Sequence, residues 1–217
     1  MTRRSRVWIP VVGAMLVLAV ALPLLLRQPR TEPATPFAEA WEAGLTFPVR
    51  VIDGARIYDV ELTDYPAVNG RVAYEGPTMS EGVENWNEAH AYRGVDLRAV
   101  VEGTVGLEHV ETFTLVALDG WHKTLPGGVL TGETACGKVV LALSMDAESP
   151  AEWAAAPLLV FLPQDERFSN KDMLDALGAD LAHYFGAAPS STGLMVKGVV
   201  FLVMDYDGGP LPTLADL

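Results

Sequence analysis

Residues 7–26 form an apolar run without a charged side chain, and this run limits the fold of the chain more than any other feature. Its 20 residues, VWIPVVGAMLVLAVALPLLL, would extend ~30 Å as a helix, which is the thickness of the hydrocarbon core of a bilayer. Pro10 falls in the first turn, where a missing N–H costs little, and Trp8 falls at an interface position. Arginines flank the run on both sides, which is unusual for a buried helix of a soluble protein. The sequence therefore predicts one N-terminal transmembrane helix.

A cleaved signal peptide is the alternative interpretation of this run, because AVA at 19–21 has small residues at the spacing of a cleavage site. Residues 22–26 continue the apolar run past that site, which favours a retained anchor. Three arginines precede the run and two follow it. This bias favours a cytoplasmic N-terminus at 1–6 and a periplasmic or otherwise extracytoplasmic remainder, anchored in the inner membrane. The span also holds small residues suited to packing on neighbouring helices, namely Gly13, Ala14, Ala19 and Ala21.

Charge is divided unevenly along the chain. The first 30 residues hold five arginines and no acid, so the remaining chain has 10 basic against 28 acidic residues, a formal charge of −18. Such a surface repels phosphate backbones, which argues against nucleic acid as a partner. Half of all residues are hydrophobic, enough for a sizeable core. The single cysteine, Cys136, permits no internal disulfide, so packing alone must hold the fold.

After the anchor, the pattern indicates a spacer, one domain and a tail. Residues 27–46 begin with a proline-rich stretch and continue into a short amphipathic segment, typical of a spacer that lifts a domain off a membrane. Residues 47–205 alternate short apolar runs with turns, and residues 206–217 form an irregular tail. We expect one mixed α+β domain at 47–205, with more strands than helices.

Periodicity and turn residues predict the elements of this domain. Asp53-Gly54 is a hairpin signal between two strands, and Ser169 is suited to cap a helix. The polar stretch at 69–92 is expected to be mostly loop. Helices are expected at 94–104 and 169–186. Strands are expected at 47–54, 55–65, 111–120, 138–146, 156–163 and 193–205.

The stretch VALDGWHKTLP at 116–126 predicts a strand that ends in a turn carrying Trp121, His122 and Lys123. Such a turn can form the lip of a cofactor pocket. It can equally be a corner of the fold, in which an Asp-Gly pair sets the bend and the tryptophan folds back over the core. No second histidine or cysteine lies nearby in the sequence, which favours the corner.

Four segments carry a family resemblance through their order. YRGVDLRAVVE at 92–102 has an aromatic-x-Gly-Val entry into a helix, and FTLVALDGWHKTLP at 113–126 has a strand followed by Asp-Gly-aromatic. A strand, a loop and a second strand follow at 137–163, and a lysine precedes a closing apolar strand at 193–205. Together they resemble the molybdopterin-binding domain of the sulfite oxidase family. This resemblance implies a β-rich sulfite-oxidase-like fold over roughly residues 48–205.

The departures from that family concern its chemistry. Its catalytic members bind molybdenum through a cysteine thiolate that precedes the aromatic-Gly-Val helix. Residues 47–92 contain no cysteine, and Cys136 follows the Asp-Gly-Trp turn, so it does not match the ligand. A pterin phosphate needs cationic partners, whereas 72–91 contain neither Arg nor Lys. We therefore expect no catalytic residue, no metal ligand and no bound cofactor.

An acidic run, EGVENWNEAH at 81–90, is the predicted docking loop. Long loops that combine charge with an aromatic side chain often carry recognition, here of a basic partner such as a soluble electron carrier. A plain polar loop is the alternative. The residues suited to docking are Glu81, Glu84, Trp86 and Glu88.

We expect a non-catalytic, single-pass accessory subunit of a larger membrane complex, of an electron-transfer or photosynthetic kind. Its extracytoplasmic domain would serve assembly, stability or docking, with other integral membrane subunits as partners. One alternative is a membrane-tethered molybdopterin-dependent oxidoreductase. Another is a module that binds a small ligand near Trp121 without metal. The oxidoreductase would need a pocket of distant residues around Trp121 and His122, built from Arg93, Arg98, Lys123 and Lys197.

The anchor can be tested by alkaline carbonate extraction of membranes that contain the full-length protein. We expect the wild-type chain to stay in the membrane pellet, and the double variant Leu16→Arg/Leu18→Arg to be released, because each arginine at the centre of a span costs about 2.5–3.5 kcal/mol. Leu16→Phe/Leu18→Phe is the matched control and should stay in the pellet. Release of the wild-type chain would contradict the anchor.

Overall fold

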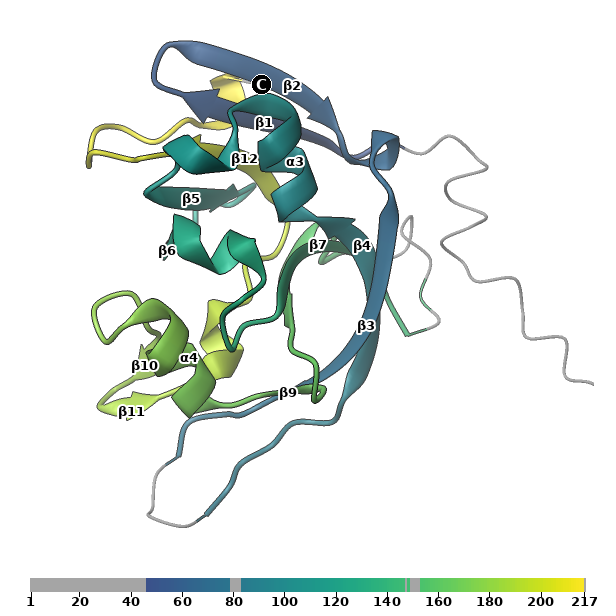
Figure 1. Ribbon diagram of the computed structural model, residues 1–217, viewed down its shortest axis with the longest axis vertical. Coiled ribbons are helices and arrows are strands. Elements are labelled where there is room, and N and C mark those ends of the chain that lie inside the picture. Colours follow the sequence, from purple (N-terminus) through teal and green to yellow (C-terminus); the bar gives the residue numbers. More distant parts are fainter. Residues whose placement is uncertain (1–45, 79–82, 147, 149–152, 217) are drawn as a thin grey trace, which may run out of the picture. The chain divides into compact units, whose positions relative to one another are not determined.

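Strands dominate the described part of the chain, residues 46–78, 83–146, 148 and 153–216 of the computed structural model (Figure 1). They form two five-stranded sheets and a short hairpin, joined by two short α-helices and several 3-10 turns. The predicted α+β class, with more strands than helices, is confirmed for these residues. No helix among them is long and apolar enough to cross a membrane. The predicted anchor at 7–26 lies outside the described residues.

The first sheet has the strand order β2-β1-β12-β5-β6. Its members are β1 (Pro48–Asp53), β2 (Arg56–Glu61), β5 (Thr112–Ala117), β6 (His122–Pro126) and β12 (Val199–Met204). β12 pairs in parallel with β1 and antiparallel with β5, so the last strand of the domain lies inside the sheet, beside the first. The Asp53-Gly54 turn between β1 and β2 is confirmed. Gly54 has φ +55°, a conformation that glycine adopts without strain.

The second sheet has the strand order β8-β7-β4-β3-β9. Its members are β3 (Ala67–Tyr74), β4 (His90–Asp96), β7 (Lys138–Met145), β8 (Leu158–Leu162) and β9 (Arg167–Phe168). Figure 1 shows β3 and β4 curving together along this sheet. The register of β4 against β7 shifts at Gly94, where a Cβ atom would lie 2.0 Å from the carbonyl oxygen of Leu141. Only glycine permits this approach, so Gly94 allows the main chains of β4 and β7 to lie this close together.

Two short helices follow strands of the second sheet, α3 (Leu97–Thr104) after β4 and α4 (Asn170–Leu177) after β9. The carboxylate of Asp96 accepts the N–H of Arg98 at 3.0 Å and so caps α3. Ser169 and Asp172 form a capping box that begins α4, as the predicted cap requires. The smaller elements are the 3-10 turns η1 (Leu62–Asp64), η2 (Leu107–His109), η3 (Gly127–Thr131), η4 (Ser191–Leu194) and η5 (Leu214–Asp216), and the hairpin strands β10 (Tyr184–Phe185) and β11 (Ala188–Pro189).

The structure corrects the predicted helix at 169–186, which ends at Leu177. Gly178 follows it with φ +73°, which breaks the helical backbone. Leu181 and Tyr184, which fall within the predicted range 169–186, lie beyond the end of α4, and Tyr184 belongs to β10.

The polar stretch at 69–92, expected to be mostly loop, is loop through its described middle residues but strand at both ends. The second half of β3 contains Val72, Ala73 and Tyr74, all buried, while the first half is polar and largely exposed. β3 pairs antiparallel with β4, with Val72 opposite His90. The sequence pattern did not predict this strand, because the first half of β3 lacks a clear alternation of apolar and polar residues.

One hydrophobic core takes side chains from both sheets and both α-helices. At its centre the Tyr74 hydroxyl accepts the N–H of Phe161 at 2.7 Å and donates to the carbonyl oxygen of Phe161 at 3.3 Å. Burial raises the pKa of Tyr74 well above its ordinary value. Because Phe161 lies on β8, the edge strand of the second sheet, Tyr74 satisfies main-chain groups that no further strand reaches.

We expect Tyr74→Phe to lower the free energy of unfolding by about 1–3 kcal/mol, because it leaves the buried N–H of Phe161 without an acceptor. Urea denaturation followed by tryptophan fluorescence measures this loss. Tyr58→Phe is the matched control, because the Tyr58 hydroxyl is only half-buried and makes no hydrogen bond within the described residues. Equal stability of the two variants would contradict the role of Tyr74.

Candidate functional site

The predicted pocket residues Trp121, His122 and Lys123 lie at the turn between β5 and β6. The carboxylate of Asp119 accepts the N–H of Trp121 at 2.9 Å, and the carbonyl of Trp121 accepts the N–H of Ala117 at 2.8 Å. Trp121 is 41% exposed, so it does not fold back fully over the core, and His122 is exposed. The Asp-Gly pair does set the bend, with Gly120 at φ +82°.

Lys123 links this turn to the segment that follows α4. Its ammonium donates to the carbonyl oxygen of Ala182 at 3.3 Å, and burial lowers its pKa. Burial and the charge of Lys123 also lower the pKa of His183. Lys123 therefore links β6 of the first sheet to the segment that follows α4.

The remaining members of the predicted basic pocket lie on other elements. Arg93 is half-buried on β4 of the second sheet, and burial lowers its pKa. Arg98 begins α3, and Lys197 is exposed in a bridge opposite Leu158. His122 and Lys123 thus lie on the first sheet, next to Trp121 in the turn, whereas Arg93 lies on the second sheet.

Cys136 does not fit a molybdenum site. It is the single cysteine of the chain, its side chain is fully buried in the core, and burial raises its thiol pKa to about 12. With no exposed surface, the Cys136 thiol offers no ligand to a cofactor bound in an open pocket of the described residues.

The predicted docking loop is held against the domain more closely than expected. Trp86 pairs with Glu75 in a β-bridge, and its indole N–H donates to the carboxylate of Glu84 at 2.8 Å. The guanidinium of Arg167 lies 5.1 Å from the centre of the Trp86 ring. Trp86 is therefore half-buried, whereas Glu84 and Glu88 are exposed. Glu81 lies outside the described residues, as do the predicted membrane-packing residues Gly13, Ala14, Ala19 and Ala21.

Sequence reasoning missed a histidine–carboxylate pair at the end of the second sheet. His90 Nδ1 lies 2.7 Å from Asp146 Oδ2, and Asp146 Oδ1 accepts the N–H of Ala91 at 2.9 Å. Burial opposes ionisation of Asp146, but the N–H of Ala91, His90 and the charge of Arg71 outweigh it and lower its pKa. These contacts tie β4 to the chain just after β7, which is a structural role.

A groove of about 940 Å³ lies between the β1–β2 hairpin and the C-terminal tail, and we call it the acidic groove. Among the described residues, no arginine, lysine or histidine lines it, although Arg56 lies 3.9 Å from the carboxylate of Asp53. Ile57, which lines it on β2, is 60% exposed. Its apolar side chains include Ile52, Ile57, Val203 and Leu211. Its acidic side chains are Asp53, Asp205, Asp207 and Asp216.

Two aspartates of the groove accept hydrogen bonds from neighbouring segments of the chain. Asp205 Oδ1 accepts the N–H groups of Glu111 and Thr112 at 2.9 and 2.8 Å. Asp216 Oδ2 accepts the N–H and the hydroxyl of Thr213 at 2.7 and 2.9 Å, and these bonds lower the pKa of Asp216. Arg50 donates to the main-chain carbonyl of Asp216, which fastens the tail to β1.

A second apolar cluster lies beside the groove, separate from the main core. It consists of the buried residues Val116, Val200 and Phe201, with Ile52, Val203 and Leu211 packed against them. Because Leu211 belongs to the tail, residues 206–216 are part of the fold and not only an irregular extension. Sequence reasoning missed the groove, since its aspartates meet only when the tail lies against the first sheet.

The sequence matches no protein-family model, and a search of curated proteins finds no match. The chemistry of the domain therefore has to be inferred from its own residues.

Thiol modification tests the burial of Cys136. In the native protein near neutral pH we expect a maleimide to leave Cys136 unmodified, and in denaturant to modify it fully, because only the exposed thiolate reacts. The variant Lys171→Cys places a thiol on the exposed face of α4 and serves as the positive control. Rapid labelling of native Cys136, detected by mass spectrometry, would contradict the buried thiol.

Proposed function

We propose that this chain is a non-catalytic, single-pass accessory subunit of a larger membrane complex, with its domain on the extracytoplasmic side of an inner membrane. The domain contributes a docking surface for another integral membrane subunit. The apolar run at 7–26 and the proline-rich spacer support the anchor. The acidic groove is the observation that carries the docking role.

The occupant that the groove favours is a basic segment with apolar side chains. In the part of the chain that the structure describes, four aspartates and no cation line the groove, so a positively charged segment complements its charge. Exposed Ile57 and the neighbouring apolar side chains offer contact area, and apolar burial provides most of the stability of an interface. The half-buried Trp86 makes the predicted docking loop the weaker candidate.

We also propose a sulfite-oxidase-like fold for residues 47–205, without the family's molybdenum chemistry. The order of YRGVDLRAVVE, the Asp-Gly-Trp turn and the closing strand supports this relationship. The buried Cys136 supports loss of the metal ligand. An electron-transfer or photosynthetic complex remains our proposal for the assembly, on the strength of that resemblance.

Native gel electrophoresis with mass spectrometry tests this function. After mild detergent extraction from native membranes, we expect the wild-type protein to migrate in a fixed ratio with other integral membrane subunits. The variant Asp53→Asn/Asp207→Asn keeps the side-chain oxygen acceptors but removes two charges, so the complex should dissociate about three- to tenfold more readily. Asp165→Asn/Asp180→Asn makes the same charge change outside the groove and should leave the complex intact.

Two outcomes would point elsewhere. Migration of the wild-type chain alone, as a small species, would contradict the accessory-subunit function. Recovery of a soluble basic protein that dissociates at moderate salt, with no membrane subunit, would replace the membrane partner with a soluble carrier.

A further inference from the structure

A second hollow, at one end of the second sheet, lies outside the acidic groove and has a different chemistry. It is a cavity of about 430 Å³, lined by the start of β3, the end of β4, the start of β7 and the end of β8. These strand ends lie side by side, because β4 is antiparallel to β3 and to β7, and β8 is antiparallel to β7. Residues of η3 and of the turn before β9 complete the wall. Open ends of curved sheets are common positions for small-molecule sites.

Cationic side chains are concentrated in this cavity. Arg71, Arg98 and Lys138 line it, although residues 31–217 contain only 10 basic residues against 28 acidic ones. Two carboxylates, Asp96 and Glu166, line it as well. Three cationic and two acidic side chains thus line the cavity, a formal excess of one positive charge. Such an excess on a strongly acidic domain favours an anion.

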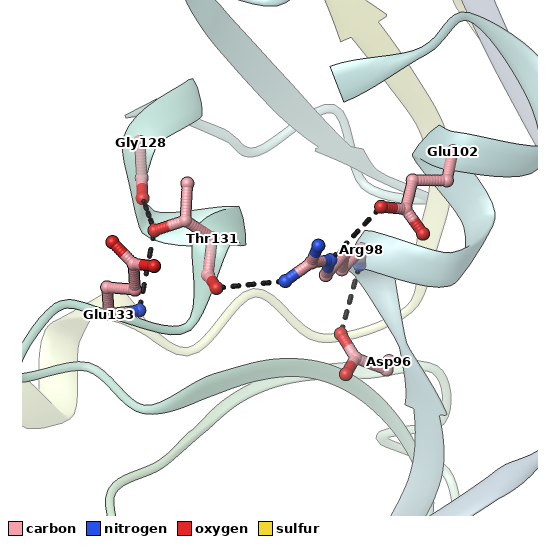
Figure 2. A network of polar contacts seen from close by, with 6 residues as sticks. All are labelled: Asp96, Arg98, Glu102, Gly128, Thr131 and Glu133. Atoms are coloured by element: carbon pink, nitrogen blue, oxygen red, sulfur yellow. Dashed lines mark hydrogen bonds and ion pairs between the residues drawn. The ribbon is translucent and has the colours of Figure 1, made fainter. Parts of the chain in front are cut away.

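Arg98 is held in place before any ligand binds (Figure 2). Its Nη1 donates to the carbonyl oxygen of Thr131 at 3.1 Å, and its Nε donates to Glu102 Oε1 at 3.2 Å. The Thr131 hydroxyl in turn donates to the carbonyl of Gly128 at 2.9 Å and accepts the N–H of Glu133 at 3.3 Å. These bonds link α3 to η3, which form two walls of the cavity. A preorganised wall loses less entropy when it binds a ligand.

Lys138 and Arg71 keep donors free for a ligand. Lys138 is exposed and forms no ion pair with any described residue. Arg71 donates from Nε and Nη2 to the carbonyl oxygen of Ala89 at 3.4 and 3.2 Å. Its Nη1 is left to donate to a ligand. Below them, Leu130 and Leu162 are buried and form an apolar floor. The cavity thus joins cationic donors to a small apolar surface, the combination typical of a site for an organic anion.

We propose that this cavity binds a small polar molecule through a carboxylate or phosphate group. Lys138 and Arg71 contact this group directly, and Arg98 holds together the two walls formed by α3 and η3. Oxyanions accept the strong, charge-assisted hydrogen bonds that ammonium and guanidinium groups donate. The site goes beyond the docking function, whose acidic groove lies at the first sheet, so either can exist without the other.

Isothermal titration calorimetry of the full-length protein in detergent tests the site, with inorganic phosphate, citrate and uncharged glucose as probes. We expect saturable binding of at least one anion and none of glucose. Phosphate alone would identify a phosphate-bearing ligand, citrate alone a carboxylate-bearing one, and both would support the shared chemistry. No saturable binding of either anion would overturn the proposal.

The residue-level test uses Lys138→Ala, which removes the ammonium without cutting a link between elements. We expect anion affinity to fall about tenfold or more, since a hydrogen bond to a charged group contributes about 1.5–3 kcal/mol. Lys171→Ala removes a lysine of α4 that pairs with Asp175 outside the cavity, and it should leave affinity unchanged. Thermal unfolding of both variants confirms that they fold. An equal loss in both, or no loss in Lys138→Ala, would overturn the assignment.

Discussion

The pairing of β12 with β1 and β5 is the contact on which the rest of the domain depends. β12, the last strand of the domain, lies between β1, the first strand, and β5. Its parallel pairing with β1 joins two strands that lie far apart in the sequence. Closing so long a loop costs conformational entropy, which burial of the apolar residues of β12 offsets. The first sheet therefore forms only when nearly the whole domain is in place.

This pairing also decides where the C-terminal tail begins. Directly after β12, Asp205 turns the chain with φ +46°, and its carboxylate accepts two N–H groups at the start of β5. The tail then packs Leu211 on the second apolar cluster, and Arg50 fastens its end to β1. The acidic groove is thus a consequence of the strand order. Because β12 lies between β1 and β5, the tail that follows β12 lies against the first sheet.

Local signals in the sequence predicted most of the strands. Asp53-Gly54, the apolar run of β8 and the Ser169 cap each act over a few residues, and each lies where it was expected. The errors occur where distant pairing or a single backbone angle decides. The polar half of β3 becomes a strand because β4 lies beside it, and α4 stops because Gly178 takes a positive φ.

The candidate sites were harder to predict than the fold, because they join residues from distant parts of the chain. Trp121, Lys123 and Arg93 are each plausible pocket residues by type, but the topology assigns them to different sheets. Conversely, Arg71 and Lys138 belong to no motif, and the antiparallel order of β3, β4 and β7 brings them to one cavity with Arg98 of α3. The proposed docking function, by contrast, rests on the acidic groove, which exists because the tail lies against the first sheet.

Site-specific photo-crosslinking in native membranes tests that docking function most directly. A photoreactive phenylalanine analogue at Ile57 reports on the acidic groove, and the same analogue at Phe185, which is 67% exposed on β10, serves as the comparison. We predict a light-dependent adduct between position 57 and one integral membrane protein, joined through a basic segment, with no such adduct from position 185. Absence of an adduct at position 57, or the same adducts from both positions, would contradict docking through the groove.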